Sequence, residues 1–142
     1  MAFEVFTEPW AAAWCEEINR SEEYKRAAET WEWPLVLVME ADPDENIDED
    51  RGVYVDLFHG ECRGARPSTS QDLNQAPYVI TADPFSWREV LEGKIEAIQG
   101  IMRGKLVLTR GNMVTLAGYI LAAQELVKAA TRIDTVFPAE EP

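Results

Sequence analysis

Several residue types are scarce in this sequence, and each scarcity excludes a class of function. The 142 residues include 13 Lys and Arg against 26 Asp and Glu, which gives a formal net charge of −13. A field of this sign repels nucleic-acid phosphates and anionic lipid surfaces, so we expect no nucleic-acid partner. His59 is the only histidine, and one imidazole is too few for a typical zinc site. A catalytic triad would have to use the same residue, and we interpret His59 as structural.

Cysteine is scarce as well, and long apolar runs are absent. Cys15 and Cys62 lack the CxxC spacing of metal and redox motifs. This fits a reducing compartment with both side chains as small hydrophobic groups, and one bridge between them stays open as the alternative. The first ten residues, MAFEVFTEPW, carry no basic segment of a signal peptide. No run reaches the roughly 18–20 apolar residues of a membrane span. We therefore expect a cytoplasmic protein without stable membrane insertion.

Two stretches imitate known motifs and fail at their most demanding positions. Residues 41–51, ADPDENIDEDR, space their acids like a calcium loop. Ile47 stands where that loop needs glycine, and Val53 where it needs a bidentate glutamate, so we interpret the stretch as a solvated hairpin loop. Lys94 and Lys105 each follow a glycine, but neither precedes the Ser or Thr of a phosphate-binding loop, and no GxGxxG is present. We predict no metal and no cofactor.

The remaining pattern predicts an alternation of helices and strands. Strands are expected at 31–40, 52–59, 78–82 and 105–109, with a short last strand or an extended tail at 133–137. Helices are expected at about 8–20, 22–30, 84–92, 95–104 and 112–130. Residues 60–77 are expected to form a polar loop. The length favours one domain, 1–142, with N-terminal helices in 1–30 and a sheet-and-helix core in 31–137.

Local signals set the ends and faces of these elements. Ser21, Asp83 and Asn112 have the short polar side chains typical of helix N-caps. Trp10, Trp14 and Ile18 recur every four residues, which predicts an apolar helix stripe packed against a sheet. Pro34 lacks an amide donor, so we expect the strand that contains it to start at a sheet edge or a bulge.

The stretch 92–128 is the most unusual part of the chain. Its last helix, 112–130, holds only two charged residues, Glu125 and Lys128. A helix with so little polar face must be covered by the protein itself, by a partner or by an apolar ligand. From the pattern alone, packing as ordinary core outweighs a ligand cavity.

The order of these parts resembles the sterol carrier protein family of lipid-transfer domains. The matching pieces are a strand at 78–82, Trp87 in a short helix that ends at Gly93-Lys94, a second helix that ends at Gly104-Lys105, and Gly111-Asn112 before the last helix. The family more often has aspartate where Asn112 stands, and the acidic loop 41–51 is outside its pattern. The resemblance covers about Trp31 to Ala130.

The resemblance implies an α/β fold of the α+β type. Its five-stranded, mostly antiparallel sheet is covered on one side by helices, with an apolar tunnel between the layers. It also implies non-enzymatic binding of a lipid, with no catalytic residues to carry over. The ligand-binding roles fall on matching positions: Phe85, Trp87, Ile98, Ile101, Met102, Met113, Leu116 and Ile120. Arg103, Lys105 and Arg110 are the nearby cations that would meet a lipid carboxylate.

We therefore predict that the chain binds, and transfers, an apolar lipid such as a fatty acid, a sterol-like molecule or an isoprenoid. Two alternatives remain open. One is a protein-interaction or homodimerisation module whose apolar arc is core and which has no cavity. The other is a small enzyme with one buried carboxylate, whose pKa would be strongly perturbed.

Overall fold

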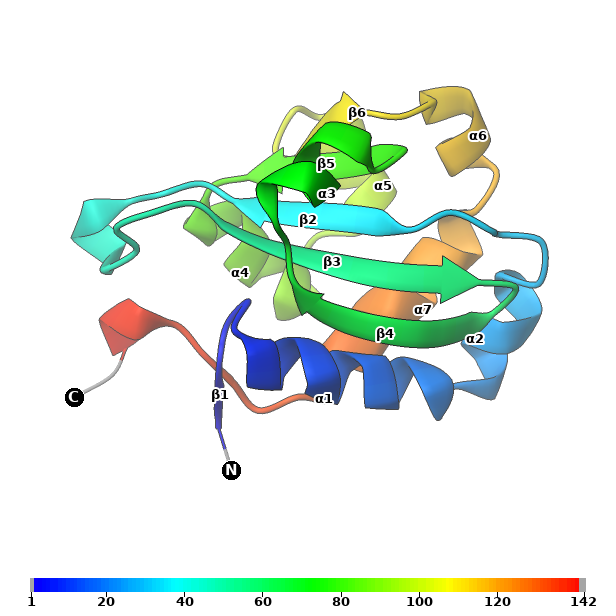
Figure 1. The fold of residues 1–142 in the computed structure, drawn as a ribbon, viewed down its shortest axis with the longest axis horizontal. Coiled ribbons are helices and arrows are strands. Elements are labelled where there is room, and N and C mark those ends of the chain that lie inside the picture. The colour runs from blue at the N-terminus through cyan, green and yellow to red at the C-terminus, as the bar shows by residue number, and fades with distance from the viewer. Residues whose placement is uncertain (1, 141–142) are drawn as a thin grey trace.

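The computed structural model describes residues 2–140 as an α/β fold around a five-stranded sheet (Figure 1). The strand order is β4-β3-β2-β5-β6. Within this sheet, β2 and β5 pair in parallel and the other three ladders are antiparallel. The predicted fold class, with its mostly antiparallel sheet, is confirmed.

The elements follow the expected order, with two additional strands, one additional α-helix and one break in a predicted helix. The strands are β1 (Phe3–Glu4), β2 (Leu35–Met39), β3 (Arg51–Phe58), β4 (Glu61–Pro67), β5 (Tyr78–Ala82), β6 (Val107–Arg110) and β7 (Thr135–Val136). The α-helices are α1 (Glu8–Asn19), α2 (Glu22–Ala27), α3 (Ser70–Gln75), α4 (Pro84–Leu91), α5 (Ala97–Met102), α6 (Met113–Ala117) and α7 (Ile120–Thr131). Two 3₁₀ turns are η1 (Pro43–Glu45) and η2 (Pro138–Glu140).

The predicted N-caps are confirmed at all three positions. The side chains of Ser21, Asp83 and Asn112 accept hydrogen bonds from the backbone N–H of the residue three positions on. Each bond satisfies an amide that has no partner within its own helix. These short polar residues therefore fix where α2, α4 and α6 begin.

The expectation of a polar loop at 60–77 is wrong. The segment forms β4 and α3, because His59 and Gly60 make a two-residue turn that sends the chain straight back along β3. Both turn residues have positive φ, 50° and 83°, as tight hairpin turns require. A side chain at Gly60 would also collide with the carbonyl of Lys25, so this turn packs directly on the end of α2.

Two further expectations need correction. The predicted continuous helix 112–130 breaks into α6 and α7 at Gly118 and Tyr119. Glycine is a poor helix former, and Tyr119 turns its ring onto Trp31, with ring centroids 4.9 Å apart. Pro34 does not mark an edge or a bulge, because it lies just before β2, and β2 is the central strand.

The core lies between the sheet and the helical layer of α1, α4, α5 and α7 (Figure 1). Alternate residues of β2 face this layer, and the predicted stripe of Trp10, Trp14 and Ile18 on α1 is fully buried in it. The opposite face of the sheet is covered near its centre by α3, where Ala76 packs with Val36. The sheet is thus enclosed on one face and partly covered on the other.

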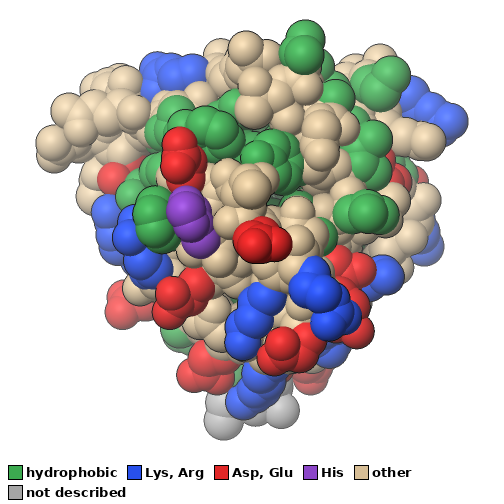
Figure 2. Space-filling view, turned by 90° about the vertical axis from the view of Figure 1, so that its right-hand side faces the viewer, with side chains coloured by type: hydrophobic (Ala, Val, Ile, Leu, Met, Phe, Trp, Pro, Cys, Tyr) green, Lys and Arg blue, Asp and Glu red, His purple; other side chains and the backbone are tan. Residues whose placement is uncertain are grey.

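Of the two alternatives at 133–137, a short last strand or an extended tail, the strand forms as β7, which pairs in parallel with β1 outside the main sheet. Within residues 2–140, no helix has the length and apolarity needed to cross a membrane. Figure 2 looks onto the end of the molecule that carries α6, and apolar side chains gather over the upper half of that view. Charged side chains fill the lower half.

Candidate functional site

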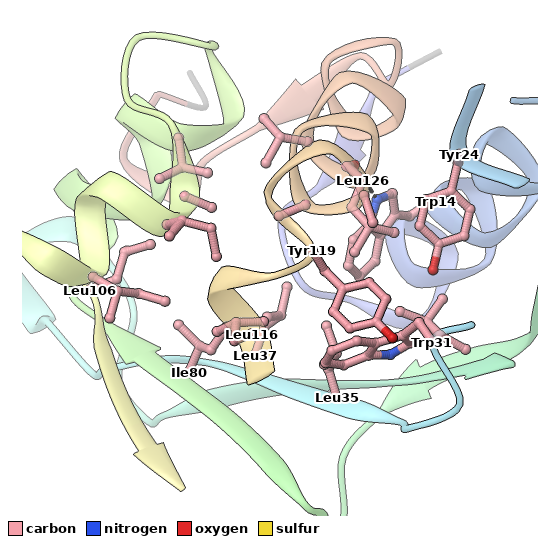
Figure 3. Close-up of a pocket in the computed structure, with 18 of the residues that line it drawn as sticks. Trp14, Tyr24, Trp31, Leu35, Leu37, Ile80, Leu106, Leu116, Tyr119 and Leu126 are labelled. Carbon is pink, nitrogen blue, oxygen red and sulfur yellow. Dashed lines mark hydrogen bonds between the residues drawn. The ribbon is translucent and has the colours of Figure 1, made fainter. Parts of the chain in front are cut away.

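An apolar cavity of about 80 Å³ lies between the sheet and the helices (Figure 3). Its floor comes from β2, β3 and β5, and its other walls come from α1, α2 and α4–α7. The lining side chains are Trp14, Tyr24, Trp31, Leu35, Leu37, Leu57, Ile80, Trp87, Val90, Ala97, Ile98, Ile101, Leu106, Leu116, Tyr119, Ala122, Ala123, Leu126 and Val127. None of them carries a charge, and their polar side-chain groups are the indole N–H groups of the tryptophans and the hydroxyls of Tyr24 and Tyr119.

The three indoles on the wall use their N–H groups elsewhere. The Nε1 atoms of Trp14, Trp31 and Trp87 donate to the carbonyls of Leu126, Trp33 and Val38, at 3.0, 2.6 and 2.8 Å. A buried indole N–H without a partner would be costly. With these bonds made, the tryptophans present apolar ring surface to the cavity and are held in one orientation.

Tyr24 is the exception on the wall. It is only 1% exposed, yet its hydroxyl makes no hydrogen bond with any group of residues 2–140. Figure 3 shows this hydroxyl directed toward Trp31, among the lining side chains. Burial raises the pKa of Tyr24 well above its ordinary value, because desolvation penalises the phenolate. The cavity thus holds one neutral hydroxyl that lacks a partner.

The cavity reaches solvent between α5 and α7. Its half-buried lining residues are Ala97 and Ile101 on α5, and Tyr119, Ala123, Leu126 and Val127 at the start of α7 and along it. At this mouth the hydroxyl of Tyr119 lies 2.9 Å from that of Thr30. The mouth is therefore bounded by α5 and by α7, which lies in the predicted helix 112–130 whose apolar surface had no assigned cover.

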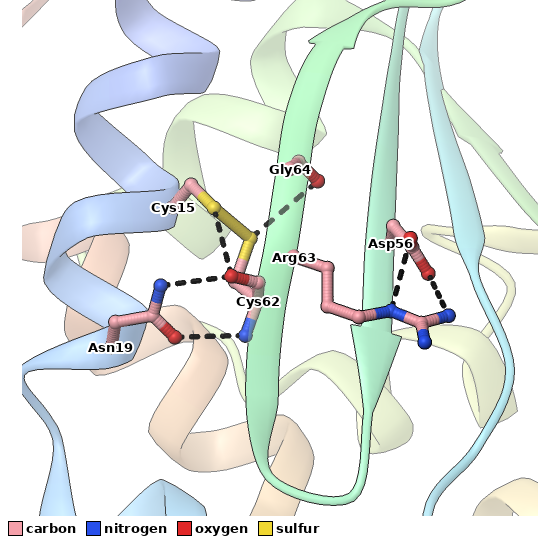
Figure 4. Close-up of a disulfide and its surroundings, with 6 residues drawn as sticks. All are labelled: Cys15, Asn19, Asp56, Cys62, Arg63 and Gly64. Carbon is pink, nitrogen blue, oxygen red and sulfur yellow. Dashed lines mark hydrogen bonds and ion pairs between the residues drawn. A yellow bond between two sulfur atoms is a disulfide. The ribbon is translucent and has the colours of Figure 1, made fainter.

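A disulfide joins α1 to β4 beside this cavity. Cys15 and Cys62 are bonded, with their Cα atoms 5.6 Å apart (Figure 4). The interpretation of two separate thiols is wrong, and the alternative of one bridge holds. The amide of Asn19 adds two bonds of 2.8 Å to the backbone of Cys62. The sulfur–oxygen contacts dashed in Figure 4 are packing contacts, since a disulfide sulfur carries no proton to donate.

This clamp protects the edge of the sheet. Backbone groups of an edge strand are free to pair with another chain unless something covers them. Asn19 and the disulfide bring α1 over β4, and Trp14 precedes Cys15 directly. Two residues that looked isolated in the sequence therefore position one wall of the cavity.

The structure places four of the predicted ligand-binding residues on the cavity and leaves the other six off it. Trp87, Ile98, Ile101 and Leu116 line it. The residues that do not line it are Phe85, Met102, Met113, Ile120, Arg103 and Lys105. Met113 packs against the core from α6, whereas Phe85, Met102 and Ile120 are exposed.

The predicted cations are engaged or exposed outside the cavity. Lys105 lies 3.5 Å from the carboxylate of Glu89 on α4. Arg110 donates to the carbonyls of Leu73 and Ala76, beside α3. Arg103 is exposed at the end of α5. A lipid carboxylate inside the cavity would meet none of the three.

Residues from the first third of the chain supply walls that the sequence patterns did not identify. Trp14, Tyr24 and Trp31 were expected to be core or were not considered. Trp31 forms an aromatic cluster with Trp33, Tyr78 and Tyr119, with ring centroids 4.9–5.0 Å from its own. Only the tertiary fold brings these residues beside α7, so their only sequence signal was the unusual density of aromatic residues.

A second cleft, near Arg88, has a larger volume of about 360 Å³. Its walls include Glu92, Asp134 and Glu140, and Arg88 is already paired with Glu45 and Glu140 at 3.4 and 3.1 Å. A polar surface cleft whose cation is engaged suits neither a lipid chain nor a free carboxylate. In the described part of the chain, no group of three or more His, Cys, Asp or Glu side chains is placed to hold a metal ion.

No protein-family model and no curated protein matches the chain, but solved structures do. The crystal structure of sterol carrier protein 2 has a TM-score of 0.83 and 44% identity, over 91% of this chain and 98% of that one. The solution structure of a conserved hypothetical protein from Thermus thermophilus, described as possibly a sterol carrier protein, has a TM-score of 0.83 and 43% identity, over 93% and 91%. Sterol carrier protein 2 from Yarrowia lipolytica, in its apo form, has a TM-score of 0.56 and 18% identity over 84% and 87%, which supports the fold alone.

Proposed function

This chain belongs to the sterol carrier protein family, and on that premise we propose that it binds an apolar lipid in the cavity between its sheet and helices. The observation that carries the proposal is the uncharged lining of this cavity, with three indoles already hydrogen-bonded to backbone carbonyls. In this proposal the chain acts as a carrier, which agrees with a lining that contains no carboxylate, imidazole or thiol.

The energy of such binding comes from removing the lipid chain from water. Each buried methylene contributes about 0.8 kcal/mol, so a twelve-carbon stretch gains roughly 10 kcal/mol. Ordering the chain and losing its free motion cost much of this gain, which leaves a dissociation constant on the order of micromolar. That range suits a carrier, because the cargo must also leave.

Filling the cavity requires its helical side to move. Ligand pockets usually measure roughly 300–1,000 Å³, and this cavity measures about 80 Å³. The break at Gly118 and the half-buried side chains of Ile101 and Ala123 support an outward movement of α5 and α7. The sheet side, which holds the disulfide and the indole bonds of Trp31 and Trp87, stays in place in this proposal, whereas the bond from Trp14 to Leu126 joins it to α7 and has to adjust.

The polarity of the cavity favours an uncharged cargo. An ionised carboxylate inside would be desolvated without a cation to pair with it, which is unfavourable. A hydroxyl or carbonyl oxygen would instead give the Tyr24 hydroxyl the partner it lacks. Among the predicted ligands, sterol-like and isoprenoid alcohols thus fit better than fatty-acid anions or acyl-CoA, whose phosphates require cations.

Substitution of Ala123 by Trp tests the proposal. Ala123 lines the mouth of the cavity, so an indole there should fill the space and lower lipid binding at least tenfold. Ala12→Trp is the matched control, because Ala12 is exposed on α1 and does not line the cavity. The protein is delipidated with organic solvent and offered long-chain alcohols, and bound lipid is counted by native mass spectrometry. Equal lipid binding by both variants, or none by the unsubstituted protein, would contradict the proposal.

The cytoplasmic location stays a prediction, and the disulfide bears on it directly. Disulfides seldom persist in a reducing cytosol, so Cys15 and Cys62 would be thiols there unless the bridge resists reduction. Mass measurement of alkylated protein taken directly from cells distinguishes the two states.

A further inference from the structure

The charge of this acidic protein is distributed very unevenly. Residues 97–124 contain Arg103, Lys105 and Arg110 and no Asp or Glu, a net charge of +3. The rest of the chain carries 10 basic and 26 acidic residues, a net charge of −16. One continuous segment of 28 residues therefore has a net positive charge in a chain that is strongly negative overall.

The same segment exposes most of the large apolar side chains found on the surface of the described residues. Five of the eight are Met102, Val107, Val114, Ile120 and Leu121. Val114, Leu121 and Met102 are 84%, 68% and 74% exposed. Apolar side chains left this open, beside cations and without acids in the same segment, are typical of an interaction surface.

This surface adjoins the mouth of the cavity. Met102 follows the half-buried lining residue Ile101, and Ile120 and Leu121 follow Tyr119. Figure 2 shows apolar side chains gathered toward the α6 side of the molecule, above a mixed charged region. We call the group Met102, Arg103, Lys105, Val107, Val114, Ile120 and Leu121 the mouth surface.

We propose that the mouth surface docks reversibly on lipid bilayers that contain anionic headgroups. Apolar side chains enter the boundary between headgroups and acyl chains, and Arg103 and Lys105 meet the phosphates. At physiological ionic strength charges are screened over about 8 Å, so the acids on the far side of the molecule have little effect on a docked face. Docking in this orientation turns the opening between α5 and α7 toward the source of cargo.

Three acids set a limit to the attraction, and one of them, Glu89, lies 3.5 Å from Lys105. Glu29 and Glu32 flank Thr30, whose hydroxyl contacts Tyr119, and both are exposed. They lie near the edge of the mouth surface and oppose anionic lipid there. We therefore expect binding that is weak and reversible, and that strengthens when both residues are changed to glutamine.

A second copy of the chain fits the mouth surface less well than a bilayer. A twofold dimer places the same surface on both subunits, so cation would face cation across the seam. An anionic bilayer offers negatively charged headgroups to the cations and an apolar interior to the apolar side chains. The docking proposal concerns the outer surface alone, and its test does not depend on filling the cavity.

The test is sedimentation of the full chain with vesicles of phosphatidylcholine, alone or with 30% phosphatidylglycerol. Val114→Glu with Leu121→Glu should lower the vesicle-bound fraction at least tenfold on both vesicle types. Arg103→Glu with Lys105→Glu should lower it at least tenfold on anionic vesicles only, since each surface cation is worth about fivefold there. Phe85→Glu is the matched control, because Phe85 is also exposed, at 52%, but lies on α4, outside the mouth surface.

Losses confined to the mouth-surface variants support docking. The absence of vesicle binding by the unsubstituted protein overturns it, as does an equal loss in Phe85→Glu. Analytical ultracentrifugation tests whether the mouth surface instead joins two copies of the chain. A dimer that Val114→Glu with Leu121→Glu converts to monomer, without vesicle binding, overturns docking and assigns the surface to a second copy.

Discussion

The two sides of the cavity are built in different ways. On the fixed side, α1 is tied to β4 by the disulfide and by the two bonds of Asn19, and β2 is the central strand of the sheet. On the adjustable side, α5 and α6 are helices of six and five residues, and α7 begins after a break. Several lining residues of the adjustable side remain half-buried, whereas Trp14, Tyr24 and Trp31 on the fixed side are buried.

This difference separates two requirements of a carrier. A fixed side gives the cargo a defined surface, and an adjustable side lets it enter and leave. Local opening free energies in a protein are lowest where few buried contacts hold an element. We therefore expect α5–α7 to open without unfolding of the sheet. Three predictions at the cavity test this contrast, and a fourth concerns an ion pair away from it.

The largest effect is expected from truncation on the fixed side. Trp14→Ala removes a buried indole and its bond to Leu126, which should lower the free energy of unfolding by about 3–5 kcal/mol. Ile101→Ala, on the half-buried adjustable side, should cost less than about 2 kcal/mol. Urea unfolding followed by circular dichroism measures both values. Similar losses of unfolding free energy at the two positions would contradict the distinction between a fixed and an adjustable side.

Reduction of the disulfide should have the next largest effect. The bridge closes a loop of 47 residues, and its loss should cost about 2–4 kcal/mol. For a chain of this size the melting temperature should fall by about 10 °C. Thermal melts with and without reductant measure the shift. The double variant Cys15→Ser with Cys62→Ser should melt at the reduced value, and reductant should not change it further.

A smaller effect is expected at Tyr24. Tyr24→Phe removes only the hydroxyl, so binding of a long-chain alcohol should weaken about fivefold, the value of one hydrogen bond of about 1 kcal/mol. Binding of the alkane of equal length should not change. Competition against a fluorescent lipid gives both affinities. If the unsubstituted protein binds alcohol and alkane equally, the hydroxyl has no role in selecting cargo.

The smallest effect lies away from the cavity, at α3. Hydrogen bonds from the Arg66 guanidinium, followed by those from Thr69, lower the pKa of Asp72 to about 2. The folded pKa is depressed, so its stabilising contribution is present above about pH 4 and is lost as the pH falls toward 2. The pair is near solvent, so Asp72→Asn should cost less than about 1 kcal/mol at pH 7. The loss should disappear near pH 2 in urea titrations.

The sequence predicted those parts of the fold that local signals determine. Ser21, Asp83 and Asn112 are N-caps, β5 has its predicted bounds, and the order of parts identified the family. β4 was missed because its residues, ECRGARP, are polar on the exposed face and carry little strand propensity. Pairing with β3 and the cover supplied by α1 hold it in place, and both are tertiary effects.

The site was predicted less completely, for the same reason. Trp87, Ile98, Ile101 and Leu116 lie on elements whose order matched the family, and all four line the cavity. Spacing on a helix identifies an apolar face but not how far that face is covered. Met102 and Ile120 therefore looked like wall residues and are exposed instead. The pairing of Cys15 with Cys62 depends on the position of α1 and left no local signal.

The tryptophan arrangement makes the cavity optically accessible. Three of the five indoles, Trp14, Trp31 and Trp87, stand on its wall, while Trp10 and Trp33 do not. A lipid brominated along its chain would quench the first three from within, and the other two less directly, since Trp10 and Trp33 contact the rings of Trp14 and Trp31 from outside the cavity. The molecule thus reports its own occupancy through native fluorescence, without a label, and the depth of the bromine along the chain would map the orientation of the cargo.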